Sequence, residues 1–273
     1  MNPDPPQTAY SGPKPPHGSG ESDSPVIPIG PAPSGESVPA AESTAVFWGW
    51  WDVFIALGLV LPSIITATFL LFIPLAVIYG ETPPVTTFAM PAQLLGYTFW
   101  LVCLWVIFRF RHGRPLWKSL HFTFPPNTLR YLALGPLLAL MVGVLGNLLR
   151  AKEIDNPMIE QLLADPVQRL LFIVFAISFG PICEEMFFRG LTLPVAIRTF
   201  GVPLAILLTS VPFALIHGPQ YSWSWQHLFL LALAGAVFGY VRVYTGSTAA
   251  AALTHCAYNL TMFGGFFLNG RNH

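Results

Sequence analysis

The segment PICEEMFFRG, residues 181–190, places two glutamates and an arginine at the end of an apolar run that is typical of a membrane span. A charged side chain in the hydrocarbon of a membrane costs about 3 kcal/mol or more, so an ionisable residue there points to function. Glu185 and Arg189 are four residues apart and can pair on one face of a helix, whereas Glu184 points about 100° away. The spacing predicts a structural Glu185–Arg189 pair and a chemically free Glu184; a pair that only joins two helices is the alternative.

Two further polar motifs lie in apolar surroundings. FALIH places Phe213 one helical turn before His217, and HCAYN places His255 one turn before Asn259. A lone buried histidine is more often a hydrogen-bonded structural group than a catalyst. Two histidines, an asparagine and two glutamates on three segments instead predict one shared site, provided that the three segments pack together.

These residue types can hydrolyse a peptide bond without a serine or cysteine nucleophile. A carboxylate in a dry cavity can act as a general base on water near neutral pH, and a histidine can share that water and protonate a leaving amine. A histidine and an asparagine can donate hydrogen bonds to an oxyanion. The same residues are also compatible with a metal site: Glu184, His217 and His255 could hold a catalytic zinc. The helical HExxH signature is absent.

The composition indicates a polytopic membrane protein. Of 273 residues, 53% are hydrophobic and only 10% are charged, against roughly 25% charged in ordinary globular domains. The net charge of zero gives no indication of nucleic-acid binding. Cys103, Cys183 and Cys256 lack metal-like spacing and are expected to act as small apolar residues.

We therefore expect an all-α bundle of transmembrane helices with about seven spans, because the backbone must satisfy its own hydrogen bonds in lipid. Each span is near the roughly 20 residues that cross a bilayer. Trp48, Trp50 and Trp51 are expected to form an interfacial belt before the first span. The spans are predicted at residues 53–79, 91–108, 131–149, from Val167 onward, 203–217, 226–243 and 247–268.

The N-terminal segment differs from the rest of the chain. Residues 1–46 are rich in Pro, Gly and Ser and are predicted to be a disordered tail, with a proline-rich ligand for a partner domain as the alternative. The tail lacks the pattern of a secretory signal peptide. Residues 47–273 are predicted to form the membrane-embedded domain, with its functional motifs within residues 167–268.

Basic residues predict the orientation in the membrane, because cytoplasmic loops are enriched in Lys and Arg. The segment between the second and third predicted spans has the strongest positive cluster and is expected to be cytoplasmic, together with the N-terminus. The short loops favour a bacterial plasma membrane. The cluster consists of Arg109, Arg111, Arg114, Lys118 and Arg130.

The order EExxxR, FxxxH and HxxxN, each on its own apolar segment, resembles the type II CAAX prenyl endopeptidase and bacteriocin-processing (Abi, CPBP) family of intramembrane proteases. The resemblance extends over roughly residues 90–268. It implies a bundle of membrane helices around a conical, water-filled cavity. The last motif has Asn in place of Asp, a replacement that many members share.

The resemblance also implies a role for each motif residue. Glu184 would be the catalytic base, and His217 would assist in activating water. His255 and Asn259 would stabilise the oxyanion, and no cofactor would be required, with zinc as the alternative. The supporting residues would be Glu185, Arg189 and Phe213.

The expected partners are the lipid bilayer and a peptide or lipidated-protein substrate, without nucleic acid. The family resemblance implies either CAAX-type processing or bacterial peptide processing and self-immunity. Two other classes stay open. A proton-coupled transporter also uses intramembrane Glu and His, but no inverted repeat is visible in the sequence, and a non-catalytic membrane scaffold would need no intact motifs.

Overall fold

The apolar segments of the sequence form helices. The computed structural model describes Met1 and residues 46–269, and every regular element in these residues is helical. From Val46 onward the described residues belong to one compact unit. The all-α prediction is therefore confirmed for this part of the chain. The tail predicted over residues 1–46 lies outside the described residues, apart from its first and last positions.

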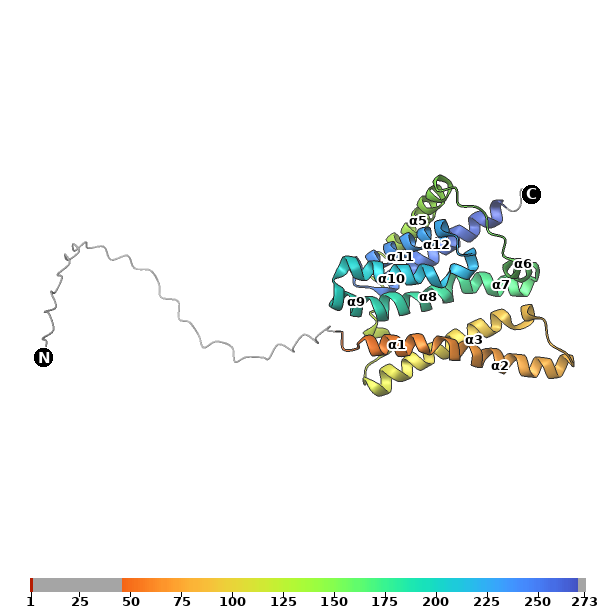
Figure 1. Cartoon of the computed structure of the whole chain (residues 1–273), viewed down its shortest axis with the longest axis horizontal. Helices are drawn as coiled ribbons and strands as arrows, with labels where there is room; N and C mark the ends of the chain where they lie inside the picture. Colours follow the sequence, from red (N-terminus) through yellow and green to blue (C-terminus); the bar gives the residue numbers. More distant parts are fainter. Residues whose placement is uncertain (2–45, 270–273) are drawn as a thin grey trace, which may run out of the picture. The chain divides into compact units, whose positions relative to one another are not determined.

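Figure 1 shows the helices in chain order. The α-helices are α1 (Trp50–Gly58), α2 (Val60–Tyr79), α3 (Val85–Val106), α4 (Leu116–Ser119), α5 (Leu129–Leu148), α6 (Pro157–Ala164), α7 (Pro166–Val174), α8 (Gly180–Glu185), α9 (Leu193–Phe200), α10 (Val202–Ile216), α11 (Trp225–Thr245) and α12 (Thr248–Asn269). The π-helical segments are η1 (Ile107–Arg111), η2 (Phe175–Phe179) and η3 (Met186–Thr192), and η4 (Gly218–Tyr221) is a 3₁₀ turn.

Each predicted span corresponds to a helical stretch, but the stretches differ in length and apolarity. In the described residues, α10 is apolar but has only 15 residues, and α12 has 22 residues but is less apolar. The protein is thus a multi-pass membrane protein, and the count of about seven spans stays a prediction. The five stretches that are long and apolar enough to cross a membrane are Trp50–Tyr79, Val85–Arg111, Leu129–Leu148, Pro166–Phe200 and Trp225–Thr245.

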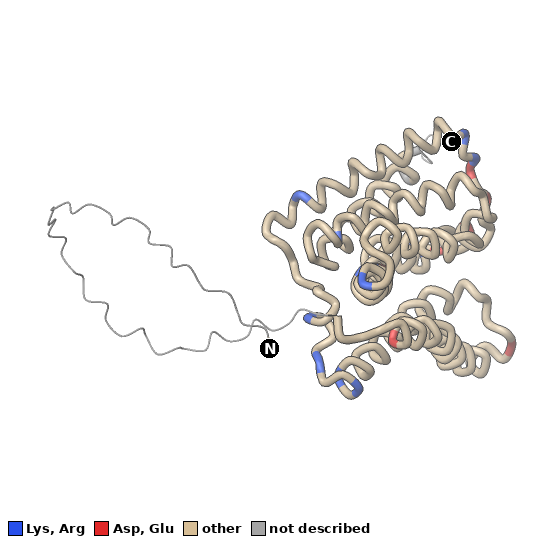
Figure 2. Tube along the Cα trace, turned by 60° about the vertical axis from the view of Figure 1, so that its left-hand side comes forward, with Lys and Arg blue, Asp and Glu red and all other residues tan. Residues whose placement is uncertain are grey.

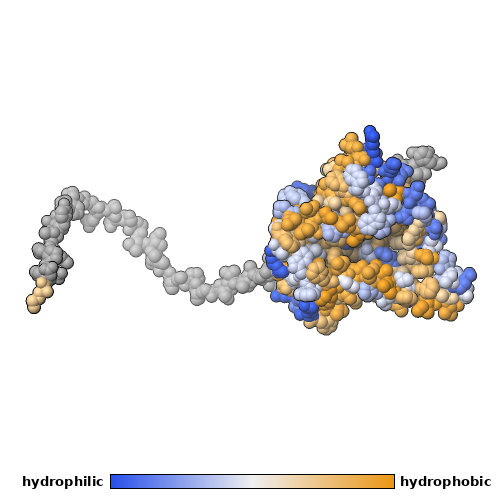
Figure 3. Space-filling model, viewed as in Figure 1, coloured by the Kyte–Doolittle hydropathy of each residue, from blue (hydrophilic) through white to orange (hydrophobic). Residues whose placement is uncertain are grey.

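Large apolar side chains cover the outside of the long helices, and Figure 3 shows them over much of one face. Examples are Leu61 and Phe69 on α2, and Leu137, Leu140 and Val144 on α5, all of which are exposed. Apolar patches of this extent are rare on proteins that are surrounded by water. A lipid environment accounts for them, because hydrocarbon solvates these side chains.

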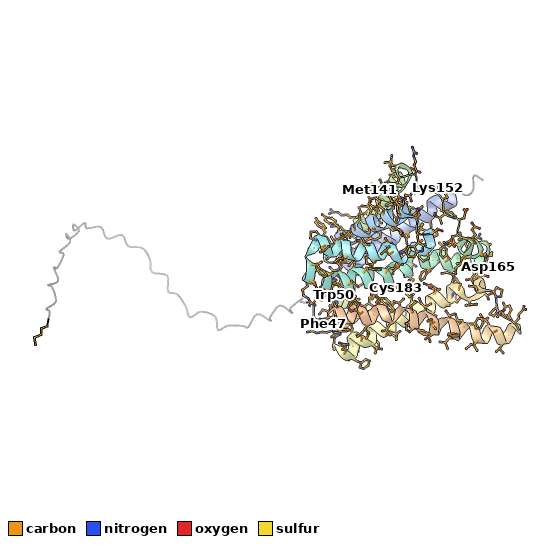
Figure 4. The ribbon with its side chains drawn as sticks, viewed as in Figure 1. Phe47, Trp50, Met141, Lys152, Asp165 and Cys183 are labelled. Atoms are coloured by element: carbon orange, nitrogen blue, oxygen red, sulfur yellow. The ribbon has the colours of Figure 1, made fainter. Side chains whose placement is uncertain are left out.

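The stretch Pro166–Phe200 has a separate apolar core on each of its two sides. Cys183 packs in one core with Trp100 of α3, and Phe188 packs in the other with Phe238 of α11. Figure 4 labels Cys183 on the side of α8 that faces the α1–α3 hairpin. The motif EEMFFR therefore lies between the hairpin and the bundle of α5, α10, α11 and α12.

Two glycines allow helices to approach closely on either side of this stretch. A Cβ at Gly96 of α3 would lie 2.9 Å from the Ile64 Cα of α2, and a Cβ at Gly135 of α5 would lie 2.5 Å from the Ala257 Cβ of α12. Small residues at such crossings are the usual means of packing helices in membranes. Both crossings therefore hold the helices around the motif at fixed distances.

The residues that precede α1 are hydrogen-bonded to the end of the motif-bearing stretch. The Trp48 indole Nε1 donates to the Leu191 carbonyl at 2.9 Å, within a buried contact. Arg198 donates to the Val46 and Trp48 carbonyls at 2.7 and 3.1 Å. We call this set of bonds the Trp48 latch; it joins the start of the domain to η3 and α9.

Charged residues concentrate near the ends of the helices, as Figure 2 shows. The basic cluster predicted to be cytoplasmic belongs to η1, the loop after it, α4 and the start of α5, at the end of the bundle where α1 also begins. Lys152 and Asp165 lie at the opposite end, where Figure 4 labels them.

Candidate active site

The two glutamates lie on a continuous helical stretch whose backbone changes from α to π geometry on both sides of them. η2 precedes α8, and η3 follows directly after Glu185. A proline follows each π segment within two residues, Pro181 after η2 and Pro194 after η3. A proline has no N–H for the preceding turn, which disfavours a regular α-helix there. π segments are rare overall, and those that occur are often found at functional sites.

Glu185 is fully buried and joins two helices. Its Oε1 accepts a hydrogen bond from Arg189 Nη1 at 3.0 Å, so the ion pair that the sequence spacing predicts is present. The same oxygen lies 2.9 Å from His255 Nδ1 of α12. A buried carboxylate is tolerated when it is paired and hydrogen-bonded in this way.

Arg189 is also fully buried and is enclosed by aromatic rings. Its Nη2 donates to the Gly235 carbonyl of α11 at 2.6 Å. Its guanidinium carbon lies 4.8 Å from the Phe213 ring centroid, 5.6 Å from that of Phe238 and 5.7 Å from that of Phe188. Cation–π contacts of this kind stabilise a desolvated cation. The charge of Arg189 is therefore held by a carboxylate, a carbonyl and three rings.

His255 connects the two glutamates. Its ring stacks on Phe238 with centroids 4.4 Å apart and meets the edge of Phe213 at 5.6 Å. While Nδ1 contacts Glu185, Nε2 lies 3.9 Å from Glu184 Oε2. One ring nitrogen is therefore fixed by the buried pair, and the other faces the second carboxylate.

Glu184 has a different environment from its neighbour in the chain. Its side chain is 16% exposed, against 0% for Glu185. Within the described residues, the contact at 3.9 Å with His255 Nε2 is its one ion-pair contact, and no hydrogen bond to its carboxylate is found. Glu184 thus keeps both carboxylate oxygens available for a water molecule or a substrate.

His217 ends α10 and is oriented by its own helix. Its Nδ1 lies 2.8 Å from the Phe213 carbonyl, one turn earlier, and its ring centroid lies 5.0 Å from that of Phe213. Because a carbonyl only accepts, Nδ1 carries the proton and Nε2 is left free. In residues 46–269, His217 makes no direct hydrogen bond to Glu184 or His255; the Phe213 ring contacts both histidines.

The turn after His217 is held in a strained conformation. Ser222 and Trp223 have positive φ angles of 49° and 56°, which are unfavourable for these residue types. A Cβ at Gly218 would lie 2.5 Å from the Trp223 ring, so only glycine fits beneath it. Burial raises the pKa of Tyr221 in this turn, so its hydroxyl stays neutral. The turn therefore fixes the end of α10 at which His217 lies.

Asn259 lies one turn after His255, as the sequence spacing predicts, but its amide reaches another helix. Its Nδ2 donates to the Ala176 carbonyl in η2 at 2.7 Å. This bond fixes the side-chain amide beside the motif-bearing stretch. The side chain at His255 Nδ1 is that of Glu185 and not that of Asn259.

The residues of the zinc alternative are not gathered around a common point. Within residues 46–269, no three His, Cys, Asp or Glu side chains are placed so that they could share a metal ion. Glu184 and His255 are neighbours, and His217 contacts neither of them directly.

A comparison with protein families matches residues 166–261 to the model described as "Rce1-like: Type II CAAX prenyl endopeptidase Rce1-like". This segment is Rce1-like. It begins with α7, ends within α12 and contains all three motifs, which supports the resemblance seen in the sequence. It covers about a third of the chain and does not include residues 90–165, to which the resemblance was expected to extend. Comparison with curated proteins and with solved structures gave no match.

Sequence reasoning missed one polar pair that faces the Rce1-like segment. Gln93 and Tyr97 lie on α3, which packs against α7 and α8. Tyr97 contacts Phe175 with ring centroids 5.1 Å apart. An amide and a phenol four residues apart in an apolar span were the signal that could have found this pair.

Two apolar hollows lie on the surface away from the Rce1-like motifs. One, of about 270 Å³, lies between α2 and α3 and is lined by residues that include Leu71, Pro74 and Phe88. The other, of about 440 Å³, lies on α5 beside Leu140 and Val144. Both are lined almost entirely by apolar side chains, as is expected of surfaces in contact with lipid chains.

Proposed function

We propose that this protein is an intramembrane endopeptidase that hydrolyses a peptide bond with water activated by Glu184. The observation that carries the proposal is the contrast between two adjacent glutamates in an Rce1-like segment. Arg189 and His255 bind Glu185, whereas Glu184 is free beside His255 Nε2. The match of residues 166–261 to a peptidase family model and a free intramembrane carboxylate support the same reaction class.

In the proposed reaction, Glu184 takes a proton from water while the water oxygen adds to the carbonyl carbon of the scissile bond. His217 assists through Nε2, which its bond to the Phe213 carbonyl leaves free. The carbonyl then re-forms as the C–N bond breaks, and the departing nitrogen takes up the proton that Glu184 received.

His255 and Asn259 are proposed to stabilise the oxyanion. With both ring nitrogens protonated, His255 donates from Nδ1 to Glu185 and from Nε2 toward the reacting carbonyl. The amide nitrogen of Asn259 has two hydrogens, of which the Ala176 carbonyl takes one. Fixed donors of this kind stabilise the charge that develops in the transition state. Glu185, Arg189 and Phe213 would support this arrangement.

No catalytic metal is proposed, and a zinc-dependent reaction through Glu184, His217 and His255 is the alternative. The proposed substrate is a peptide or a lipidated protein at the membrane, processed either at a CAAX tail or in bacterial peptide processing and self-immunity. A bacterial plasma membrane, with the N-terminus and the basic cluster on the cytoplasmic side, fits the distribution of Lys and Arg.

The test is cleavage of fluorogenic peptides, farnesylated and unmodified, by the purified full chain in lipid nanodiscs. We expect the wild type to form a product and Glu184→Gln to lower kcat by about 10²–10⁴-fold, because Gln cannot accept the proton. Glu160→Gln, an exposed position on α6, is the matched control and should retain activity. Equal rates in the wild type and Glu184→Gln would refute the proposal, and so would the absence of any product, as expected of a transporter or a scaffold.

A further inference from the structure

Helix α3 packs against α7 and α8 of the glutamate-bearing stretch, and it carries an amide and a phenol in an apolar span. Gln93 is the one amide and Tyr97 the one phenol in the sequence of this helix. They are four residues apart, so they lie on the same face. Polar side chains are rare in membrane spans and generally face the interior of a bundle, where they serve a function.

Aromatic contacts place this face of α3 against the part of the chain that carries Glu184. The Tyr97 ring meets Phe175 at 5.1 Å and an interplanar angle of 86°, and meets Phe179 at 6.4 Å. One turn further along α3, Trp100 meets Phe187 at 6.1 Å. Phe179 comes before Glu184 and Phe187 comes after it, so the Tyr97–Trp100 turn lies across from the carboxylate.

The aromatic contacts hold the Tyr97 ring in place beside the glutamate-bearing stretch. The Tyr97 hydroxyl interacts with the Gln93 side chain, one turn earlier, and lies within electrostatic reach of Glu184. α3 itself is held firmly: Trp100 Nε1 donates to the Ala56 carbonyl at 2.8 Å, and Gly96 packs directly on the backbone of Ile64. Tyr97 therefore presents a neutral donor and acceptor from a firmly held helix.

A peptide substrate at an intramembrane site needs hydrogen-bond partners for its backbone. An extended backbone brings N–H and C=O groups out of water, and each unpaired group costs free energy in an apolar environment. In the proposed mechanism, Glu184, His255 and Asn259 act on the reacting carbonyl and leave the neighbouring backbone groups without partners. A phenol can donate to a carbonyl or accept from an N–H without adding a buried charge.

We propose that Tyr97 is a substrate-positioning residue, whose hydroxyl forms a hydrogen bond with one backbone group of the peptide beside the scissile bond. Gln93, one turn earlier on the same face of α3, is placed to orient the hydroxyl. The inference rests on the proposed peptidase function and assigns to α3, outside the Rce1-like match, the alignment of the substrate with Glu184.

Tyr97→Phe removes the hydroxyl and retains the ring contacts, so it tests the hydrogen bond alone. We expect KM to rise about tenfold with kcat within about twofold, since one hydrogen bond contributes roughly 1 kcal/mol or slightly more. Peptide binding in a Glu184→Gln background, measured by fluorescence anisotropy, should weaken by the same factor. Tyr79→Phe, at the half-exposed end of α2, is the matched control and should leave both constants unchanged.

A series of peptides with single ester or N-methyl groups next to the scissile bond makes the test specific. For the one peptide that lacks the backbone group paired with Tyr97, wild type and Tyr97→Phe should have equal KM. An unchanged KM of Tyr97→Phe for the all-amide peptide would overturn the inference while leaving the peptidase function intact, and so would a penalty that is equal for every modified peptide. If the wild type cleaves no peptide, the function and the inference fail together.

Discussion

Glu184 and Glu185 are adjacent in the chain, but they face environments of opposite character. On the Glu185 side, the carboxylate, the Arg189 guanidinium and the His255 ring form a fully buried network that three phenylalanine rings enclose. On the Glu184 side, the carboxylate is partly exposed and has one histidine nitrogen at 3.9 Å.

The difference shows how one helix separates a structural carboxylate from a reactive one. A 100° step around the helix moves a side chain from a closed network to a free position. The Glu185 side, here called the closed side, tolerates a buried charge because its partners compensate for the lost hydration. On the Glu184 side, here called the open side, the carboxylate can act as a base on water. His255 belongs to both sides, so the structural network also sets the direction of the histidine nitrogen that faces Glu184.

The largest effect on this contrast is expected from breaking the closed side. Glu185→Gln leaves the Arg189 charge buried without its partner and should lower the free energy of unfolding by about 3–5 kcal/mol. Glu184→Gln, the matched neighbour, should change it by less than about 0.5 kcal/mol. Thermal unfolding in detergent measures both. Adding Arg189→Leu to Glu185→Gln should recover part of the loss, and equal stability of the two single variants would remove the distinction between the glutamates.

The next largest effect concerns the open side. Asn259→Ala should lower kcat by about 10²–10³-fold and leave KM nearly unchanged, because the oxyanion donor acts in the transition state. Asn259→Asp should be as inactive, since an ionised aspartate cannot donate to the oxyanion or to the Ala176 carbonyl. The measurement is kcat and KM of both Asn259 variants with a fluorogenic peptide. Near-normal turnover of Asn259→Asp would rule out donation by Asn259.

A smaller effect is expected where the closed side meets the backbone of α11. A Cβ at Gly235 would lie 3.1 Å from Arg189 Nη2 and 3.1 Å from Phe213 Cδ1, so Gly235→Ala should destabilise the protein by roughly 1–3 kcal/mol. A Cβ at Gly239, one turn later, would lie 3.4 Å from Ile206 Cγ2, an ordinary contact. Gly239→Ala is the control and should be neutral or stabilising. Unfolding temperatures that fall equally for both variants would contradict a specific role of Gly235.

The smallest expected effect is that of metal removal. If Glu184 and the histidines activate water without a metal, dialysis against a strong chelator should leave the cleavage rate within about twofold, since no Lewis acid is removed. The measurement is peptide cleavage before and after dialysis, with a zinc peptidase treated in parallel. Loss of activity that stoichiometric zinc restores would favour the zinc alternative and would assign a ligand role to the open side.

Much of the helical architecture could be predicted from apolar runs. The third predicted span, 131–149, corresponds to Leu129–Leu148, and the sixth, 226–243, corresponds to Trp225–Thr245. The Glu185–Arg189 pair followed from spacing on one helix. These features depend on neighbours in the sequence, which is why periodicity and hydrophobicity find them.

The contacts between helices could not be predicted in the same way. The bond between His255 and Glu185 joins residues 70 positions apart, and the bond from Asn259 to Ala176 joins residues 83 positions apart. Which side chain a histidine meets depends on the rotation of two helices about their axes, and π segments change that rotation locally. The polar Gln93 and Tyr97 stand out in the sequence of α3, but the sequence of that helix does not show that the glutamate-bearing stretch packs against them.

The Trp48 latch has a mechanical consequence. A pulling force applied to the chain at Val46 is transmitted through Trp48 and Arg198 to η3 and α9 as well as along the covalent backbone to α1. The Leu191 carbonyl that receives the Trp48 bond lies two residues after Arg189. Tension at the N-terminal end of the domain would therefore act on the helical turn that contains Arg189 and its buried ion pair. It would do so before α1 begins to unfold.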